Sequence, residues 1–161
     1  MNALAYIAVG SNFEDPLNHV LTAFDELAKL PKSELIKKSS CYLSKPQGYV
    51  DQPNFINAVV LIKTDLTPEM LLTELQSLEN KHGRKRLFPN APRTLDLDIL
   101  FIEGVEIKTS LLTIPHARMH ERSFVIFPLQ EINANIYIPH IGDLAKIAKA
   151  LNPKSAKRIT L

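Results

Sequence analysis

The chain has 161 residues, of which 45% are hydrophobic and 22% are charged, and its formal net charge is +2. These values predict one globular domain spanning 1–161, and the charge is too small to indicate a nucleic-acid-binding protein by itself. No apolar run approaches the ~18 residues of a membrane span, so no membrane association is expected. The single cysteine, Cys41, excludes an intrachain disulfide and fits a protein of the reducing cytoplasm. We also expect the protein to be a monomer.

The first half of the chain predicts a strand, a helix and two further strands. Apolar residues at 4–9 predict the opening strand. Asp15 followed by Pro16 is a favourable helix start, with Asp as the capping residue and Pro in the first turn. The segments 39–43 and 57–64 are predicted to be strands, and the long proline-containing loop between them is of a kind that often carries function.

The second half predicts another helix and then a strand with an unusual polar face. Thr67 and Pro68 repeat the cap-and-proline start, and an irregular basic loop follows at 83–92. RTLDLDIL, at 93–100, alternates apolar and polar residues as a half-buried strand does. A turn signal after this strand predicts a hairpin partner at 105–107. Two further helices are expected, at 128–133 and 143–151.

The predicted order of elements is β-α-β-β-α-β, with extra elements at the end. This order is typical of the ferredoxin-like α+β fold, in which helices pack on one face of a mostly antiparallel sheet. We expect two long loops, at 44–53 and 83–92, to lie on the other face.

The two aspartates of RTLDLDIL, Asp96 and Asp98, lie on one face of the predicted strand, ~6.5–7 Å apart at the backbone. They could simply be solvated, but Asp is a poor strand former. Mg²⁺ is bound by one or two carboxylates together with phosphate oxygens and water. The pair therefore predicts a metal site. Basic residues near it in the sequence favour a phosphate ligand over a solvated face: Arg84, Lys85, Arg86, Arg93 and Arg122.

Two other kinds of site receive little support. His116 and His120 stand four residues apart, a spacing that could hold zinc on a helix, but no third ligand accompanies them. Neither GxxxxGK[ST] nor GxGxxG is present, so a bound nucleotide would not rest on a glycine-rich loop. By propensity alone, Phe55 and Phe124 are predicted to be core residues.

The chain resembles 6-hydroxymethyl-7,8-dihydropterin pyrophosphokinases, enzymes of folate biosynthesis, over nearly its whole length. The motifs that carry the resemblance are YIAVGSN (6–12), DQPNFINAV (51–59), GRKR (83–86), PRTLDLDIL (92–100) and IPHARMHERSFVIFPL (114–129). The resemblance implies a ferredoxin-like fold and an enzyme that transfers pyrophosphate from ATP to the hydroxymethyl group of a dihydropterin, releasing AMP. It also implies two Mg²⁺ ions bound by Asp96 and Asp98.

The remaining site residues follow from the same resemblance. The residues expected to serve catalysis are Arg84, Arg93, Asp96 and Asp98. Those expected to bind ATP are Gln76, Glu79, Arg84, Arg86, Arg93, Ile99, His116 and Arg122. Those expected to bind the pterin are Ser44, Lys45, Gln47, Phe55, Asn57, Asp96 and Phe124. Whether Asp98 also accepts the hydroxyl proton stays open. Phe88, the one aromatic residue of the second loop, either covers the site or packs on the domain body.

Two functions of other classes are weighed against this one. A ferredoxin-like nucleic-acid-binding module would need aromatic residues in a pattern such as K/R-G-F/Y-G/A-F-V-x-F/Y, which the sequence lacks. An inactive relative with a structural role is disfavoured because Asp96, Asp98, Arg84 and Arg93 are all present.

Overall fold

Strand β1 (Ala3–Ser11) lies at the centre of the main sheet. It pairs antiparallel with β4 (Phe55–Thr64) on one side and with β5 (Asp96–Ile102) on the other. The computed structural model describes residues 2–46, 50–83 and 92–161. The positions predicted at Gln47, Arg84, Arg86 and Phe88, and most of the loop at 83–92, lie outside the described residues.

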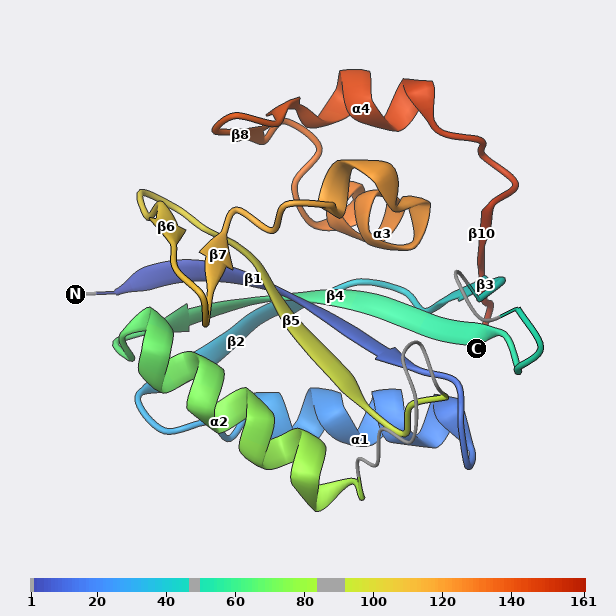
Figure 1. The fold of residues 1–161 in the computed structure, drawn as a ribbon, viewed down its shortest axis with the longest axis horizontal. Helices are drawn as coiled ribbons and strands as arrows, with labels where there is room; N and C mark the ends of the chain where they lie inside the picture. The colour runs from blue at the N-terminus through green and yellow to red at the C-terminus, as the bar shows by residue number, and fades with distance from the viewer. Residues whose placement is uncertain (1, 47–49, 84–91) are drawn as a thin grey trace.

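Two interleaved β-α-β units build the sheet (Figure 1). Helix α1 (Pro16–Leu27) joins β1 to β2 (Ser33–Lys38), and helix α2 (Pro68–Lys81) joins β4 to β5. Both β1 and β2 run antiparallel to β4, and β5 runs antiparallel to β1. Each helix therefore connects two strands of the same direction that flank a strand of the other unit. This arrangement confirms the predicted α+β, mostly antiparallel fold.

The single strand predicted at 39–43 is wrong, because the chain is interrupted there. β2 and β3 (Tyr42–Ser44) follow one another along the same edge of β4. Between them the Ser39 hydroxyl accepts a hydrogen bond from the backbone N–H of Val59, at 2.9 Å. The backbone N–H of Ser39 still donates to the Val59 oxygen, at 2.9 Å, so a side chain replaces only one of the two backbone partners here. β10 (Ala156–Arg158) then pairs with β3 and extends the sheet.

The two predicted helix starts behave differently. The Thr67 side chain caps α2 by accepting a hydrogen bond from the backbone N–H of Met70, at 3.2 Å. Asp15 also precedes its helix directly, but its φ is 68° and its side chain makes no capping hydrogen bond. Capping requires an extended backbone at the cap residue. The predicted role of Asp15 as a side-chain cap is therefore wrong.

Helices cover both faces of the sheet, so the expectation that one face is left to two loops is wrong. α1 and α2 lie on one face, and α3 (Ser123–Ile132) and α4 (Leu144–Ala150) lie on the other (Figure 1). The first core packs Ile7 and Val9 of β1 against α1 and α2. The second core packs Tyr6 of β1 against the apolar side chains of α3. α3 begins five residues before the predicted start at Pro128, because those earlier residues supply much of its buried apolar surface.

The hairpin predicted from β5 to 105–107 is also wrong. Gly104, with φ 76°, turns the chain after β5, but the next strand, β6 (Ile107–Lys108), pairs with β7 (Thr113–Ile114). A 3₁₀ turn (Met119–Glu121) then leads into α3, and a second small hairpin joins β8 (Tyr137–Ile138) to β9 (Gly142–Asp143). Among the described residues, no helix has both the length and the apolar character to cross a membrane.

Candidate active site

The register of three strands sets polar side chains in a row across the sheet. Gly10 of β1 lies opposite Asp96 of β5 on one side and opposite Asn57 of β4 on the other. Asp98 lies opposite Ala8, one step further along the same face. Because side chains alternate between the two faces of a strand, all of these residues face α3, and the small ones leave space above the sheet.

Gly10 is needed because the Asn57 side chain lies directly over it. A Cβ atom at this position would stand 2.5 Å from Asn57 Oδ1. The Asn57 amide in turn donates to the hydroxyl of Ser44 on β3, at 3.1 Å. Asn57 therefore packs on Gly10 and is hydrogen-bonded to Ser44, and these two contacts fix its carboxamide at the cavity wall.

A cavity opens between this row and the start of α3. Its lining combines an acidic pair, two arginines, two aromatic rings and several amide or amine groups. The polar and aromatic members are Lys45, Gln52, Phe55, Asn57, Arg93, Asp96, Asp98, Arg122 and Phe124. The Arg122 guanidinium lies over the Phe124 ring, 5.8 Å from its centre. Phe124 is partly buried and packs against the second core, whereas Phe55 is partly buried and belongs to neither core, so the prediction from propensity is wrong for Phe55.

A second, mainly polar cavity adjoins the first beside α2. It is lined by Leu72, Gln76, Glu79, Arg93, Asp96, Leu97, Asp98, His116 and Arg122. Arg93, Asp96, Asp98 and Arg122 line both cavities. The acidic pair and two cations thus stand at the boundary between an aromatic chamber and a polar one.

Burial and like charge act together on Asp98. Burial is the largest cause that raises the pKa of Asp98, to about 7, and the neighbouring carboxylate of Asp96 adds to it. Arg122 and Arg93 act in the opposite direction, while Glu79 raises the pKa further. A bound divalent cation would relieve this repulsion, because it favours both ionised carboxylates.

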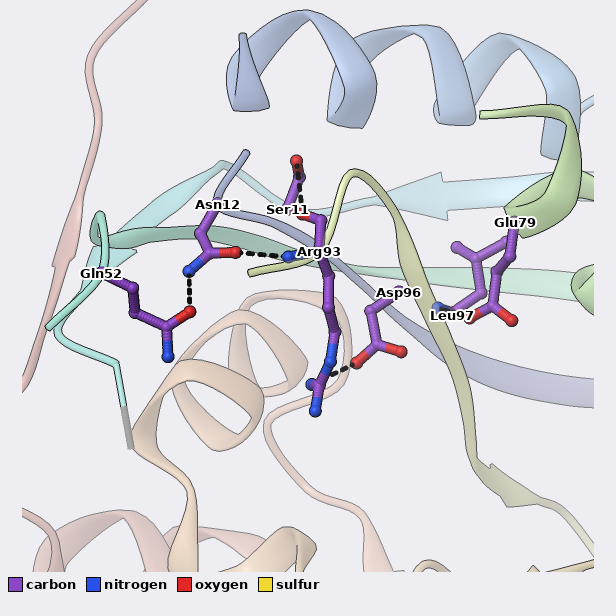
Figure 2. Close-up of polar contacts among 7 residues, drawn as sticks. All are labelled: Ser11, Asn12, Gln52, Glu79, Arg93, Asp96 and Leu97. Atoms are coloured by element: carbon purple, nitrogen blue, oxygen red, sulfur yellow. Dashed lines mark hydrogen bonds and ion pairs between the residues drawn. The ribbon is translucent and has the colours of Figure 1, made fainter. Parts of the chain in front are cut away.

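Arg93 and Arg122 each have a buried N–H donor that makes no hydrogen bond within the described part of the chain. Arg93 Nη1 contacts Asp96 Oδ2 at 3.1 Å, as Figure 2 shows. The Nε atoms of Arg93 and Arg122 are both buried and make no hydrogen bond within the described part of the chain. Since unpaired buried donors are rare, these atoms point to an anionic ligand that is bound in the working protein.

His116 is held in one tautomer. Its Nδ1 accepts a hydrogen bond from the backbone N–H of Arg118, at 3.2 Å, so the neutral ring carries its proton on Nε2. Burial and the nearby Arg122 lower the pKa of His116, and Asp96 opposes them. A neutral ring with a fixed Nε2–H donor suits a phosphate oxygen in the second cavity.

Glu79 is fixed to the strand that carries the acidic pair. Its Oε2 accepts a hydrogen bond from the backbone N–H of Leu97, at 2.8 Å, and the residue is buried (Figure 2). Leu97 lies between Asp96 and Asp98. The Glu79 carboxylate therefore joins α2 to β5 where the acidic side chains emerge.

The structure brings most of the predicted site residues to the two cavities. The described residues predicted to bind the pterin line the first cavity, except Ser44, which supports Asn57 from behind. Those predicted to bind ATP line the second cavity, except Ile99. Ile99 is buried in the core under α1 and α2, so its side chain faces away from both cavities.

Asn12 and Gln52 were missed by the sequence reasoning. Gln52 lines the first cavity, and buried Asn12 donates to Gln52 Oε1 and accepts from the backbone of Arg93. A signal existed, because both residues stand inside the motifs YIAVGSN and DQPNFINAV. Without the fold, a polar residue just after a strand is an ordinary turn residue.

Relatives of known name are similar to most of the chain. A 2-amino-4-hydroxy-6-hydroxymethyldihydropteridine pyrophosphokinase from Haemophilus influenzae is 45% identical over 145 residues, which cover 90% of this chain and 91% of the relative. The protein of the same name from Bacillus subtilis is 46% identical over 132 residues, covering 82% of this chain and 79% of the relative. The folic acid synthesis protein fol1 of Pneumocystis carinii is 40% identical over 88% of this chain, which spans only 19% of that longer protein.

Solved structures and a family model agree with these relatives. The fold matches wild-type Plasmodium falciparum HPPK-DHPS with pteroate, with a TM-score of 0.80 at 14% identity, over 100% of this chain and 46% of that one. The chain therefore spans about half the length of that structure, and the likeness concerns the fold. The model of the 7,8-dihydro-6-hydroxymethylpterin-pyrophosphokinase family matches residues 6–134. Together, the family match and the pyrophosphokinase relatives show that the chain belongs to the 7,8-dihydro-6-hydroxymethylpterin-pyrophosphokinase (HPPK) family.

Proposed function

We propose that this protein transfers the terminal diphosphate of ATP to the hydroxymethyl oxygen of 6-hydroxymethyl-7,8-dihydropterin, with release of AMP. The observation that carries the proposal is the pair of adjoining cavities that share Arg93, Asp96, Asp98 and Arg122. One cavity suits a flat aromatic ligand and the other a polar, anionic one. The four shared residues, which can bind phosphate directly or through a metal ion, lie at the boundary between the two cavities.

The pterin would occupy the first cavity. Phe55 and Phe124 supply aromatic faces for a bicyclic ring, and Asn57 supplies a fixed carboxamide for its polar edge. Lys45 lines the same chamber. Stacking would give affinity, and the few fixed polar groups would give the identity of the ligand.

ATP would occupy the second cavity. Its phosphates would lie toward the boundary, within reach of Arg93, Arg122 and the Nε2–H of His116. Gln76 of α2 lines the same cavity, and we propose that it contacts the rest of the nucleotide. The family resemblance also implies that Arg84 and Arg86 bind ATP; both lie outside the described residues. Glu79 contributes by holding β5 in place.

Asp96 and Asp98 are the residues that would bind Mg²⁺, and we propose two ions. The donor set fits, since hard divalent cations bind carboxylate and phosphate oxygens. Burial and, after it, the Asp96 carboxylate raise the pKa of Asp98, and a bound cation would offset this repulsion. Bound Mg²⁺ would neutralise the charge of the transferring diphosphate. Two carboxylates without further protein ligands are sufficient when phosphate oxygens and water complete the shell.

The atoms balance in a single displacement. The hydroxymethyl oxygen attacks the β-phosphorus, and the bond from that phosphorus to the oxygen bridging to the α-phosphorus breaks. The bridging oxygen leaves with AMP, and the β–γ bond stays intact. Asp98, ionised when Mg²⁺ is bound, lies at the boundary of the two cavities and has carboxylate oxygens that can take the hydroxyl proton. Arg93 and Arg122 would offset the charge that develops on the leaving group.

Three further expectations belong to this proposal. We infer one catalytic domain, because the helices pack on the two faces of one main sheet, with a core on each face. We also infer a monomer that works in the cytoplasm, where the buried free thiol of Cys41 would stay reduced.

Phosphorus NMR of the purified protein with ATP, Mg²⁺ and the dihydropterin tests the reaction. We expect AMP and a pterin diphosphate to form in equal amounts. Accumulation of ADP would contradict diphosphate transfer. Asp96→Asn and Asp98→Asn should each abolish turnover while the circular dichroism spectrum is retained. Asp25→Asn, on the exposed surface of α1, is the control and should leave turnover unchanged.

A further inference from the structure

Asn12 connects the two halves of the site through a fully buried side chain. Its exposed fraction is 0%, and it lies just after β1, between the segment before β5 and the segment before β4. Toward β5 it makes two hydrogen bonds with one residue: Arg93 N donates to Asn12 Oδ1 at 2.8 Å, and Asn12 N donates to Arg93 O at 2.9 Å. This two-point contact fixes the backbone of Arg93, whose guanidinium holds Asp96 (Figure 2).

The other side of the same carboxamide holds the pterin half of the site. Asn12 Nδ2 donates to Gln52 Oε1 at 2.8 Å and to the backbone oxygen of Pro53 at 3.0 Å. Gln52 lines the first cavity, and Phe55 follows Pro53 by two residues. Figure 2 shows Asn12 between Gln52 and Arg93, with a dashed contact to each.

The orientation of the Asn12 carboxamide is determined by its partners. A backbone N–H can only donate, so Oδ1 must face Arg93, and a backbone carbonyl can only accept, so Nδ2 must face Pro53. The amide thus presents an acceptor to one half of the site and donors to the other. No other uncharged side chain of this size and shape offers both, and isosteric Asp offers only the acceptor when it is ionised.

We infer that Asn12 is a positioning residue that sets the distance between the pterin and the phosphates. It touches neither the proposed substrates nor the reacting atoms. It acts through Arg93 on the phosphate side and through Gln52 and Pro53 on the pterin side. Because an in-line displacement needs the reacting atoms aligned within ångströms, small relative shifts of the two halves would affect turnover more than the binding of either ligand. This inference rests on the proposed assignment of the two cavities.

Asn12→Asp tests the inference because it alters one side of the link selectively. The acceptor toward Arg93 is retained, whereas the donors are replaced by an oxygen that faces the Pro53 carbonyl oxygen and requires the Gln52 amide to turn before it can donate. We expect kcat to fall about 10- to 100-fold, with the KM for ATP and the KM for the pterin each changing less than about threefold. Asn18→Asp makes the same chemical change on the exposed surface of α1 and should leave kcat unchanged.

A kcat of Asn12→Asp within twofold of the native value would overturn the inference. So would a loss of activity equal to the fraction of unfolded protein at the assay temperature, measured by circular dichroism, since the residue would then be purely structural. Inactive native protein would instead overturn the proposed function, so the two failures are distinguishable.

Gln52→Met provides a second variant in case Asn12→Asp does not fold. Gln52 is only partly buried, in a segment outside the strands and helices, so its replacement should spare the fold. If Asn12 acts through Gln52, the two substitutions should be non-additive, and the double variant should lose no more kcat than Asn12→Asp alone. If Asn12→Asp does not fold, Gln52→Met should by itself lower kcat at least threefold. Multiplicative losses in the double variant, or native kcat for Gln52→Met, would contradict the inference.

Discussion

At the scale of single residues, Asp96 and Asp98 repel each other, but the same two carboxylates can bind a cation. Asp98 is buried beside Asp96, and both effects raise its pKa, to about 7. Without a metal, the folded protein therefore holds this proton more tightly than the unfolded chain does. Charge that would be unfavourable in an ordinary strand is retained because a cation and a phosphate ligand can relieve it.

Because the pKa of Asp98 is raised, Asp98→Asn should increase the stability of the metal-free protein at high pH but not at low pH. The unfolded carboxyl titrates near the ordinary Asp value of 3.8 and the folded one near 7, so the stability contributed by the protonated group is present below pH 3.8 and is lost as the pH rises through 7. The variant does not titrate, so we expect it to be more stable than the native protein by on the order of 4 kcal/mol at pH 8. Its advantage should be absent at pH 4.

Urea unfolding at the two pH values in EDTA measures this difference. Asp25→Asn, which is exposed, is the control and should show no such pH dependence. An equal effect of Asp98→Asn at pH 4 and pH 8 would refute the raised pKa.

At the scale of secondary-structure elements, α1 and α2 are joined by a polar contact outside the site. Glu26 of α1 accepts a hydrogen bond from His82 Nε2 at the end of α2 and pairs with Lys81 Nζ at 3.2 Å. His82 Nδ1 lies 2.7 Å from His19 Nδ1 on α1. Burial acts to raise the pKa of Glu26, but the hydrogen bonds from His82 and Lys81 outweigh it and lower the pKa.

Glu26→Gln should therefore destabilise the protein near neutral pH and have little effect in acid. A lowered pKa means that the ionised carboxylate stabilises the fold above pH 4.5, and that this contribution is lost as the pH falls through the pKa of the folded state. We expect a loss of about 1.5–3 kcal/mol at pH 7, the usual range for a hydrogen bond to a charged group. Thermal melts at pH 7 and pH 3.5 would measure it.

Glu34→Gln is the matched control, because Glu34 is exposed on β2 and forms no ion pair among the described residues. It should leave the melting temperature unchanged at both pH values. If Glu26→Gln behaved in the same way, the contact between the helices would contribute nothing to stability.

At the scale of the whole molecule, one sheet separates two cores. Leu75 of α2 lies fully buried in the first core, and Leu129 of α3 lies fully buried in the second. Both cores use the side chains of β1, on its alternate faces. The apolar side chains on each face of β1 are buried only while the helices cover that face, so we expect the two layers to unfold together.

Leu75→Ala and Leu129→Ala test this expectation as a matched pair. Each should lower the free energy of unfolding by about 2–5 kcal/mol, the cost of emptying a buried leucine site. Each should also shift the midpoint of one urea transition without changing its slope. A biphasic transition in the Leu129→Ala protein would show that the α3–α4 layer unfolds separately.

Much of the fold followed from short-range pattern in the sequence. The alternation of RTLDLDIL placed Asp96 and Asp98 on one strand face, and the Thr67-Pro68 start located α2 to within a residue. Such features depend on backbone geometry and on neighbours a few positions away, which a single sequence records. The acidic pair and its nearby arginines were likewise visible, because their residue types alone limit what they can bind.

Only the tertiary structure decided the features that join distant segments. The Ser39 hydroxyl bonds to Val59 between β2 and β3, and Asn12 bonds to Gln52 and Arg93, which are 40 and 81 positions away. The placement of α3 over the second face, and of Ile99 in the first core, depends in the same way on which surfaces meet. Hydrogen bonds and packing between residues far apart in the chain leave no periodic signal, so they appear only when the folded backbone brings the partners together.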